Sequence, residues 1–364
     1  MVDVLVTGGG SGGHVTPGIA VGQVLQGQGL DVVFVGSDTG LEEALVQPAG
    51  LRYLGIKAGK LRRYFSWQNL LDAFRVLLGI GQALVLVGRE RPKVVFSKGG
   101  FVAFPVVFAA WVWRVPVVAH ESDATQGLAN LLSAPFVKTL CAGFPDTQVR
   151  SLFGSFKGRF VYTGAPIRRE LLEGNAQAGR AALGVADDRR VLLVTGGSLG
   201  ADALNTCVIG AAEELAQRNW FVAHVCGAGK ERAADGPGYR AFDYVAEGWA
   251  DLLAAADVVV SRAGANSVFE LLALGKPNLL VPLPLAGSRG DQLDNARYAE
   301  AGGFSRVVPQ EQLDSERLIS SVESLWQDID DVRAALKKFV AADATLAIVA
   351  EIRALAPQLP NAHH

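Results

Sequence analysis

The sequence has little cysteine, no long hydrophobic run and almost no net charge, and each absence excludes a class of protein. Three cysteines among 364 residues, Cys141, Cys207 and Cys226, are too few for a disulfide scaffold and lack metal spacing, so we interpret them as reduced thiols in the core of a cytosolic protein. The longest apolar runs, Val76–Gly88 and Gly99–Trp113, hold 13 and 15 residues, and a bilayer span needs roughly 20. A net charge of −2 gives no general attraction for nucleic acid.

Several catalytic motifs are also missing. The sequence contains no G-x-S-x-G, H-E-x-x-H, P-loop or paired-cysteine motif. The one D-x-D, Asp328-Ile-Asp330, falls in the helical tail, where a solvent-exposed helix face accounts for it. We therefore expect no metal site. A bound nucleoside diphosphate would have to be neutralised by helix N-termini and by a basic group such as Arg168.

The first twenty residues carry the pattern around which the chain is organised. Val2–Thr7 predicts a buried strand, which leaves no room for a signal peptide. Five of the next six residues are glycine, and Pro17 opens a predicted helix. Strand, glycine loop and helix together bring backbone N–H groups against a phosphate. His14 closes this loop, where an imidazole can act as a general base at neutral pH. A tight turn and a structural histidine are the alternatives.

Strand-like and helix-like segments alternate along the whole chain, which specifies mostly parallel sheets covered by helices. Strands are expected at 2–7, 31–36, 53–56, 94–98, 116–121, 137–143 and 160–163, and then at 190–195, 220–226, 242–245, 257–261, 278–282 and 304–308. The predicted fold class is α/β, with two Rossmann-like, doubly wound parallel-sheet domains that face a cleft. We place one domain at 1–163 plus a C-terminal helix at about 341–358, and the other at 164–340.

The composition shifts between Lys57 and Lys93, where eight basic residues stand against two acidic ones. Apolar residues from Trp67 onward recur at helical spacing, which fits a core stripe. The preceding Leu61-Arg-Arg-Tyr-Phe-Ser segment mixes basic and aromatic side chains, which suits an anionic membrane surface. The stretch Leu61–Leu78 is thus a candidate membrane contact, with a core stripe and a protein partner as the alternatives.

A second glycine-containing turn stands in the second half, at Ser261-Arg-Ala-Gly-Ala-Asn-Ser-Val-Phe-Glu270. It follows a predicted strand and opens a helix, so its N–H groups would form a second anion cradle. Glu270 would lie beside that cradle, where a carboxylate can accept both hydroxyls of a ribose. A capping box of Asn266 or Ser267 with Glu270 is the alternative. The polar segment that holds Asp291, Gln292 and Asn295 suits sugar hydroxyls and solvent equally.

Together these motifs resemble those of the MurG family of glycosyltransferases. The resemblance rests on Gly8-Gly-Gly-Ser-Gly-Gly-His14-Val-Thr-Pro17, His120-Glu-Ser-Asp, Gly196-Gly-Ser-Leu-Gly200 and Arg262-Ala-Gly-Ala-Asn-Ser-Val-Phe-Glu270 with Asp291-Gln292, in the family's order. It extends from Met1 to about Ala356. Members of the family have the GT-B fold and transfer N-acetylglucosamine (GlcNAc), with inversion, from UDP-GlcNAc to the C4 hydroxyl of the muramoyl sugar of lipid I, which gives lipid II.

The resemblance implies a peptidoglycan-synthesis enzyme held peripherally at the cytoplasmic side of the cell membrane. Its substrates would be UDP-GlcNAc and lipid I, and its further partners the anionic membrane surface, through Leu61–Leu78, and other cell-wall synthesis proteins. It implies no nucleic acid partner, no cofactor and no divalent metal.

The resemblance also implies roles for individual residues, with His14 as the base or a critical acceptor-site residue. The implied acceptor-binding residues are Gly12, Gly13, Lys98, Gly99, Gly100, Asp123 and Asn130. The implied donor-binding residues are Ser11, Gly12, Arg168, Ser198, Leu199, Val245, Gly264, Ala265, Asn266, Ser267, Glu270, Asp291, Gln292 and Asn295. Among the latter, Arg168 and Ser198 would lie near the phosphates and Val245 would meet the uracil. Glu270 would bind the ribose, and Gln292 with Asn295 the sugar.

This sequence departs from the family pattern at two places. Ser122-Asp123 and Asp291-Gln292 stand where better-known members have Gln-Asn and Gln-Gln. The roles of Asp123 and Asp291 are therefore open, and so is the peptide variant of the acceptor.

Three other functions compete with this interpretation. A nicotinamide oxidoreductase would use the first glycine loop with Asp38 as its ribose partner, but it leaves the second loop and Glu270 unused. Another GT-B enzyme, such as a glycolipid synthase or a UDP-GlcNAc 2-epimerase, would use both loops. A catalytically silent membrane adaptor would keep only the fold and the basic, aromatic surface.

Overall fold

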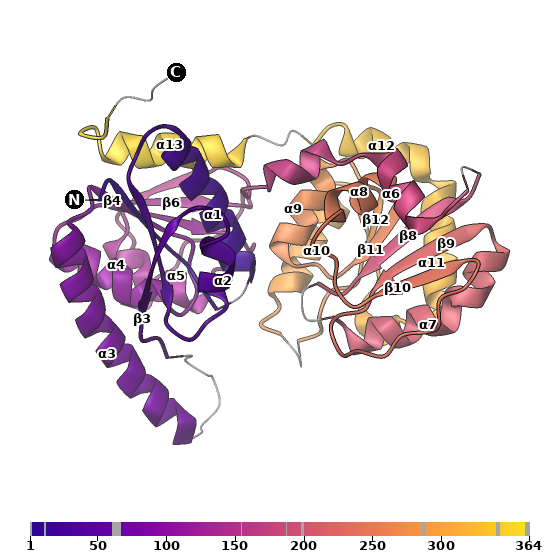
Figure 1. Ribbon diagram of the computed structural model, residues 1–364, viewed down its shortest axis with the longest axis horizontal. Coiled ribbons are helices and arrows are strands. Elements are labelled where there is room, and N and C mark those ends of the chain that lie inside the picture. The colour runs from indigo at the N-terminus through magenta and orange to yellow at the C-terminus, as the bar shows by residue number, and fades with distance from the viewer. Residues whose placement is uncertain are drawn as a thin grey trace. The chain divides into compact units, whose positions relative to one another are not determined.

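The protein consists of two α/β units, each built on one parallel sheet (Figure 1). The computed structural model describes residues 2–10, 12–59, 67–153, 155–186, 188–197, 200–285, 288–339 and 343–360, and for 67–74 the backbone alone. Unit 1 comprises Met1–Ile167 with Ala342–His364, and unit 2 comprises Arg168–Ala341. The predicted fold class of two doubly wound, parallel-sheet domains is confirmed. Each unit is described below by itself.

The described residues of unit 1 form a seven-stranded parallel sheet in the order β3-β2-β1-β4-β5-β6-β7. Its strands are β1 (Val4–Thr7), β2 (Val32–Ser37), β3 (Arg52–Ile56), β4 (Val94–Ser97), β5 (Val117–Glu121), β6 (Thr139–Ala142) and β7 (Arg159–Tyr162). Its helices are α1 (Gly12–Gly27), α2 (Glu42–Val46), α3 (Trp67–Glu90), α4 (Ala103–Val112), α5 (Leu128–Ser133), the 3₁₀ turn η1 (Ala134–Phe136) and α13 (Ala344–Leu355).

Both faces of this sheet are buried, because successive strand residues point to opposite faces and both sets are apolar. Val4 of β1 faces a cluster that includes Ile19 of α1 and Ile352 of α13. Leu5, the next residue, faces a second cluster that includes Ala83 of α3 and Val106 of α4. The last helix of the chain therefore completes the core of the first unit (Figure 1).

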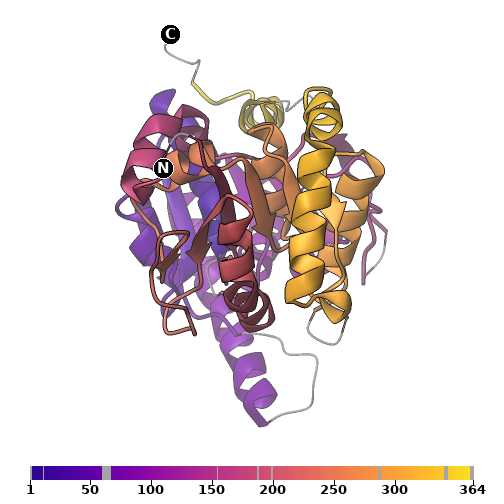
Figure 2. The same ribbon diagram turned by 90° about the vertical axis from the view of Figure 1, so that its right-hand side faces the viewer.

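The described residues of unit 2 form a six-stranded parallel sheet in the order β10-β9-β8-β11-β12-β13. Its strands are β8 (Arg190–Thr195), β9 (Trp220–Val225), β10 (Tyr239–Phe242), β11 (Val258–Ser261), β12 (Asn278–Leu280) and β13 (Arg306–Val307). Its helical segments are η2 (Arg169–Glu173), α6 (Ala176–Leu183), α7 (Asp202–Gln217), α8 (Trp249–Ala255), α9 (Ala265–Ala273), α10 (Asp291–Ala301), η3 (Gln310–Gln312), α11 (Ser315–Gln327) and α12 (Ile329–Leu336). Helices α7 and α11 pack side by side against this sheet (Figure 2).

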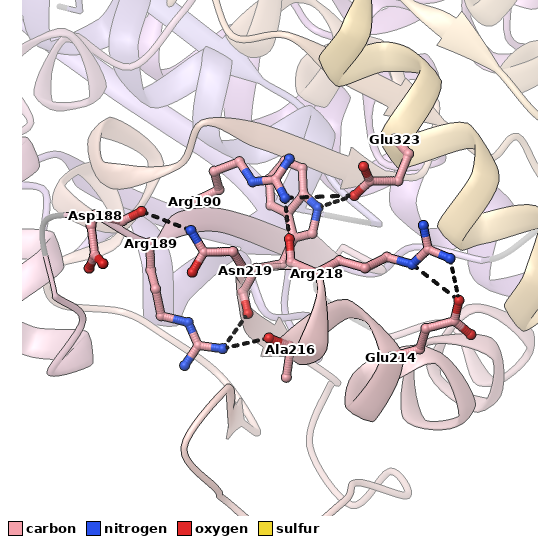
Figure 3. Close-up of polar contacts among 9 residues, drawn as sticks. Asp188, Arg189, Arg190, Glu214, Ala216, Arg218, Asn219 and Glu323 are labelled. Atoms are coloured by element: carbon pink, nitrogen blue, oxygen red, sulfur yellow. Dashed lines mark hydrogen bonds and ion pairs between the residues drawn. The ribbon is translucent and has the colours of Figure 1, made fainter.

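Arginine side chains hold the amino end of the second sheet together, where α7 ends and β8 and β9 begin (Figure 3). Arg189 donates to the Ala216 carbonyl at 3.0 Å, and Arg190 donates to the Arg218 carbonyl. The last carbonyls of a helix have no partner within it and carry a partial negative charge, so cationic donors stabilise this end. The opposite edge of the sheet is left for the loops that follow the strands.

Two element boundaries differ from those expected from the sequence. Helix α1 begins at Gly12, five residues before the expected start at Pro17, so the glycine loop itself supplies the first helical turn. Strand β10 covers Tyr239–Phe242 and not 242–245, because the buried Tyr239 bonds to His224 of β9 while Tyr244 is exposed. Val245 consequently lies in a loop beyond the strand.

Other expectations concern cysteine and the membrane. The three cysteines are free thiols, and Cys141 and Cys226 are buried whereas Cys207 is half-buried. Within the described parts of the chain, no helix combines the length and the apolar character that crossing a bilayer requires.

Candidate active site

Each sheet has a point at which the strand order reverses, and ligands of open α/β sheets bind beside this point, at the carboxyl ends of the strands. In unit 1 the reversal lies between β1 and β4, followed by the loops 8–10 and 98–100. In unit 2 it lies between β8 and β11, followed by the segments that begin at Gly196 and at Arg262. The glycine motifs singled out from the sequence begin in these segments.

The two loops of unit 1 are packed into one another. The Gly9 amide donates to the Gly99 carbonyl at 3.3 Å. Gly100 has a φ of +85°, and a side chain there would stand 1.9 Å from the Gly9 carbonyl oxygen. Only glycine fits this position, because another residue would meet both backbone strain and a backbone atom. The loops are therefore one double turn at the edge of the sheet.

The Glu42 side chain holds this double turn in place, a role that was not predicted from the sequence. Its side chain is fully buried at the start of α2, and Oε1 accepts the Gly10 amide at 2.8 Å. A side chain at Gly9 would stand 2.2 Å from the same oxygen. The Gly9 and Gly10 amides are thus engaged within the protein.

His14 is the third residue of α1 and is half-buried. Gly8 packs closely against the His14 carbonyl: a Cβ atom added at Gly8 would lie 2.9 Å from the His14 carbonyl oxygen. This close packing fixes where the helix starts relative to β1. His14 therefore stands in the first helical turn, beside the double turn, with Gly12 and Gly13. Ser11 lies outside the described residues.

A buried polar cluster follows β4 and β5 at the same edge. Lys98 is 1% exposed, and its ammonium donates to the Ser122 hydroxyl. Burial lowers the pKa of Lys98 to about 8, a shift that the carboxylates of Glu121 and Asp123 oppose. The Lys98 ammonium is thus embedded beneath the loop that departs from the family pattern.

Glu121 organises the other side of this cluster and was also missed as a site residue. Its carboxylate accepts the Gly127 amide at 2.7 Å, the Asn130 side-chain amide at 3.0 Å and the Asp123 amide at 3.2 Å. Asn130 also donates to the His120 carbonyl and lies against Gly99. The structure thus brings together the predicted acceptor residues Lys98, Gly99, Asp123 and Asn130.

His120 lies beneath this cluster and is fully buried. Its Nε2 meets the Gly164 carbonyl at 2.9 Å. Burial, together with the nearby Lys98 ammonium, holds its pKa well below the ordinary value. His120 is therefore a neutral structural group, which leaves His14 as the histidine of this edge with an accessible side chain.

In unit 2, the N-terminus of α9 stands directly after β11. The helix begins at Ala265 and its N-cap, Gly264, forms no side-chain cap. The alternative of a capping box with Glu270 is wrong, because the Glu270 carboxylate pairs with Arg168, at 3.2 Å from Nε and 3.5 Å from Nη2. The first turn of α9, Ala265–Ser267, therefore stands at the sheet edge, and the Glu270 carboxylate does not cap it.

The ion pair between Arg168 and Glu270 fixes the position of both side chains. Burial raises the pKa of Glu270, and the Arg168 guanidinium opposes the shift. Arg168 also lies 3.4 Å from Glu170. The predicted phosphate-binding and ribose-binding residues of the donor are thus adjacent in unit 2.

The three predicted donor-binding residues of α10 occupy different environments. Gln292 accepts the Leu283 amide at 3.0 Å, and Asp291 pairs with Arg289 at 3.5 Å. Asn295 is fully buried and donates to the Ala263 carbonyl at 3.1 Å. Asn295 consequently positions the loop before α9, while Asp291 and Gln292 stand half-exposed at the start of α10.

Two further donor predictions, Ser198 and Leu199, lie outside the described residues. No group of three or more His, Cys, Asp or Glu side chains with a metal-binding arrangement occurs in the described ranges. Asp328 of the D-x-D sequence pairs with Arg306 on the surface, with about half of each side chain exposed.

Comparison with known proteins finds matches along nearly the whole chain. The glycosyltransferase family 28 N-terminal domain matches residues 4–141, and the family 28 C-terminal domain matches residues 191–348. A UDP-N-acetylglucosamine--N-acetylmuramyl-(pentapeptide) pyrophosphoryl-undecaprenol N-acetylglucosamine transferase of Legionella pneumophila (strain Paris) is 44% identical over 352 residues, 96% of each chain. The transferase of the same name from Clostridium kluyveri is 45% identical over 89% of this chain and 91% of its own.

Solved structures agree with these matches. The structure of MurG from Acinetobacter baumannii has a TM-score of 0.75 at 26% identity and covers 97% of this chain and all of its own. A UDP-GlcNAc 2-epimerase from Neisseria meningitidis bound to UDP-GlcNAc has a TM-score of 0.67 at 14% identity and covers 96% of this chain and 99% of its own. At that identity the epimerase shows a shared fold alone.

Proposed function

The chain belongs to glycosyltransferase family 28 and, within it, to the MurG family, and from this we propose that it transfers GlcNAc from UDP-GlcNAc to the muramoyl sugar of undecaprenyl-diphospho-N-acetylmuramoyl-pentapeptide. The product is lipid II, the disaccharide precursor of peptidoglycan. The observation that carries the proposal is the 44% identity over 96% of both chains with a transferase whose name states this donor and this acceptor.

In the proposed reaction, unit 1 holds the acceptor. The first-turn N–H groups of α1 and the glycine pair 99–100 face the diphosphate, because helix N-termini and turns of this kind attract anions. His14, in the same turn, takes the proton from the C4 hydroxyl as its oxygen attacks the anomeric carbon. The bond to the UDP oxygen breaks on the opposite face, so the configuration inverts.

Unit 2 holds the donor. The Glu270 carboxylate accepts the ribose hydroxyls, and the loop at Val245 presents backbone groups to uracil. The N–H groups of Ala265–Ser267 stabilise the negative charge that develops on the leaving diphosphate, with Arg168 as the nearby cation. These two sources of positive charge are the basis for proposing a reaction that needs no divalent metal.

A grid of donors and acceptors tests this function. UDP-GlcNAc is combined with a soluble lipid I analogue, with a glycolipid acceptor that lacks the diphosphate, or with no acceptor, each with and without EDTA. The proposal expects UDP release and a GlcNAc-MurNAc product only with the lipid I analogue, in the presence of EDTA as well. UDP-ManNAc formed without acceptor would instead indicate an epimerase, and no turnover in any arm would indicate a non-catalytic adaptor.

We also propose that unit 1 binds the membrane surface peripherally, on the cytoplasmic side where UDP-GlcNAc is made available. Residues 61–66 of the predicted contact lie outside the described residues, but the helix that follows supports it. Leu77 and Val85 of α3 are 66% and 71% exposed. These two side chains therefore do not belong to the core. Trp111 and Trp113, at the end of the adjoining helix α4, are each about half exposed. Apolar and aromatic groups of this kind insert into the headgroup region, and Arg75 and Arg89 add attraction for anionic lipids.

Vesicle binding tests the membrane contact. The variant L77E/V85E should lower affinity for vesicles that contain phosphatidylglycerol by about tenfold or more, because two apolar groups are lost and two negative charges added. The control L172E/L346E changes leucines that are 59% and 51% exposed on other surfaces and should bind like the wild type. If L77E/V85E and L172E/L346E had the same affinity for the vesicles, the membrane contact would not involve Leu77 and Val85.

A further inference from the structure

Arg168 contacts two carboxylates in unit 2, and they lie on different edges of its guanidinium. Nε and Nη2 donate to Oε1 and Oε2 of Glu270, at 3.2 and 3.5 Å. Nη1 donates to Oε1 of Glu170 at 3.4 Å. A guanidinium is a rigid, planar fork of N–H donors, so one edge can hold a carboxylate while another binds a second anion. Glu170 therefore occupies the edge of Arg168 that Glu270 leaves available.

The two carboxylates differ in how firmly they are held. The Glu270 side chain is 18% exposed and belongs to α9, whereas the Glu170 side chain is 70% exposed and belongs to the short 3₁₀ segment η2. An exposed ion pair is weak, because water screens the charges and both side chains lose freedom when they pair. Glu270 is thus the stable partner of Arg168, and Glu170 is the partner that an incoming anion can displace.

The anion that would meet this edge of Arg168 is the diphosphate of the donor. Glu270 lies four residues after Asn266, so both side chains project from the same face of α9, about one helical turn apart. The side chains of a helix tilt toward its N-terminus, which brings the pair of Glu270 and Arg168 toward the first turn of α9. In the proposed function this first turn binds the leaving diphosphate, and the inference rests on that assignment.

We propose that Glu170 competes with the donor diphosphate for Arg168 and thereby lowers the affinity of unit 2 for UDP and UDP-GlcNAc. When the nucleotide binds, the diphosphate replaces Glu170 at Nη1, and Glu270 keeps Arg168 in place through Nε and Nη2. When the nucleotide leaves, Glu170 pairs with Arg168 again. Glu170 thus weakens donor binding, which is the opposite of what a residue that positions Arg168 for the phosphates would do.

Calorimetry with UDP distinguishes competition from positioning. The variant E170Q keeps the shape of the side chain and removes its charge. At low salt, E170Q should bind UDP about two- to fivefold more tightly than the wild type, the range expected for one exposed ion pair. The difference should disappear in about 1 M NaCl, where exposed charges are screened. Unchanged or weaker UDP binding by E170Q at low salt would overturn the proposal.

Glu173 provides the matched control. It belongs to the same segment η2, is 69% exposed and pairs with Arg169 at 3.6 Å. The variant E173Q removes the same charge from the same segment and should bind UDP like the wild type. If E173Q bound UDP as tightly as E170Q, the gain would come from the change in net charge, and the proposal would fail.

A double-mutant cycle with R168M tests whether Glu170 acts through Arg168. Methionine removes the guanidinium and should weaken UDP binding, because the diphosphate loses its nearby cation. Added to R168M, E170Q should bring no further change, since the group for which Glu170 competes is absent. The same gain in both backgrounds would mean that Glu170 repels the diphosphate directly, which would contradict the competition.

Inorganic pyrophosphate separates this proposal from the proposed function. The competition concerns an anion at Arg168, so E170Q should also bind pyrophosphate more tightly than the wild type does. If the wild type bound pyrophosphate but not UDP, the assigned donor would be wrong, while the comparison with E170Q would still decide the competition. Equal pyrophosphate affinity in the two proteins would overturn the competition and leave the glycosyltransferase function intact.

Discussion

At the scale of single residues, the proposed reaction depends most on His14. Its place in the first turn of α1, beside the double turn of unit 1, suits a group that takes a proton from a bound acceptor. Replacing His14 with alanine should lower kcat by about 10²–10⁴ if it is the base. The KM for UDP-GlcNAc should change little, because Arg168, Glu270 and the first turn of α9, which hold the donor in the proposed reaction, lie in unit 2. Steady-state kinetics with a lipid I analogue measure both values, and a H14A variant with ordinary turnover would exclude His14 as the base.

Residues also mark where sequence reasoning was sufficient and where it was not. The carboxyl ends of the strands could be located from the apolar runs and the glycines after them, so Gly99, Glu270 and His14 were placed at the correct edges. The direction of individual side chains could not be predicted from the apolar runs and glycines. Asn295 stands one helical turn from Gln292 in the sequence, yet it is buried against the Ala263 carbonyl. Glu42 lies 32 residues from the amide that it accepts, a separation that no local pattern reveals.

At the scale of secondary-structure elements, the double turn of unit 1 requires glycine at position 100. The variant G100A places a methyl group against the Gly9 carbonyl at a φ of +85°. We expect a loss of about 1–3 kcal/mol in the free energy of unfolding and a rise in the acceptor KM, because the two loops must separate. Urea unfolding and acceptor kinetics measure the two effects.

A helix glycine provides the comparison for this variant. Gly81 lies within α3, and an added side chain meets nothing within 4 Å. The variant G81A should gain about 0.5–1 kcal/mol, since alanine favours the helix. If G100A and G81A had the same stability, the double turn would not be tightly packed.

Strand β9 carries a titratable group that should couple the stability of the protein to pH. His224 is fully buried, with Nδ1 2.8 Å from the Tyr239 hydroxyl and Nε2 3.0 Å from Asn205 Oδ1. Burial lowers its pKa to about 4 from 6.5. Between these values the unfolded chain binds a proton and the folded chain does not, so stability falls as the pH falls from about 6.5 to about 4. Above pH 6.5 the histidine contributes no pH dependence.

The variant H224Q isolates this contribution. The wild type should lose up to about 3 kcal/mol more than H224Q between pH 7 and pH 4, in urea unfolding at a series of pH values. His120, buried neutral in unit 1, adds a loss of the same sign to both proteins and cancels in the difference. Parallel curves for the two proteins would show that His224 keeps an ordinary pKa.

Element boundaries were the least predictable part of the fold, for physical reasons that these positions illustrate. Pro17 is a frequent helix start, but α1 begins at Gly12 because the glycine loop is held from outside by Glu42 and Gly99. The segment 242–245 alternates like a strand, but β10 forms earlier because Tyr239 finds a buried partner in His224. Long-range contacts decided both boundaries.

At the scale of the whole molecule, the proposed reaction places the acceptor on unit 1 and the nucleotide on unit 2. Hydrogen exchange with the intact protein tests this assignment. Saturating UDP should slow amide exchange in peptides that cover 264–270 and 245, because the first turn of α9 and the uracil loop gain hydrogen bonds and lose water. Peptides that cover 8–14 and 98–100 should exchange as in the free protein. A lipid I analogue should protect those peptides instead. If UDP protected 8–14 and left 264–270 unchanged, the two units would have exchanged roles, and His14 could not act as a base on an acceptor bound to unit 1.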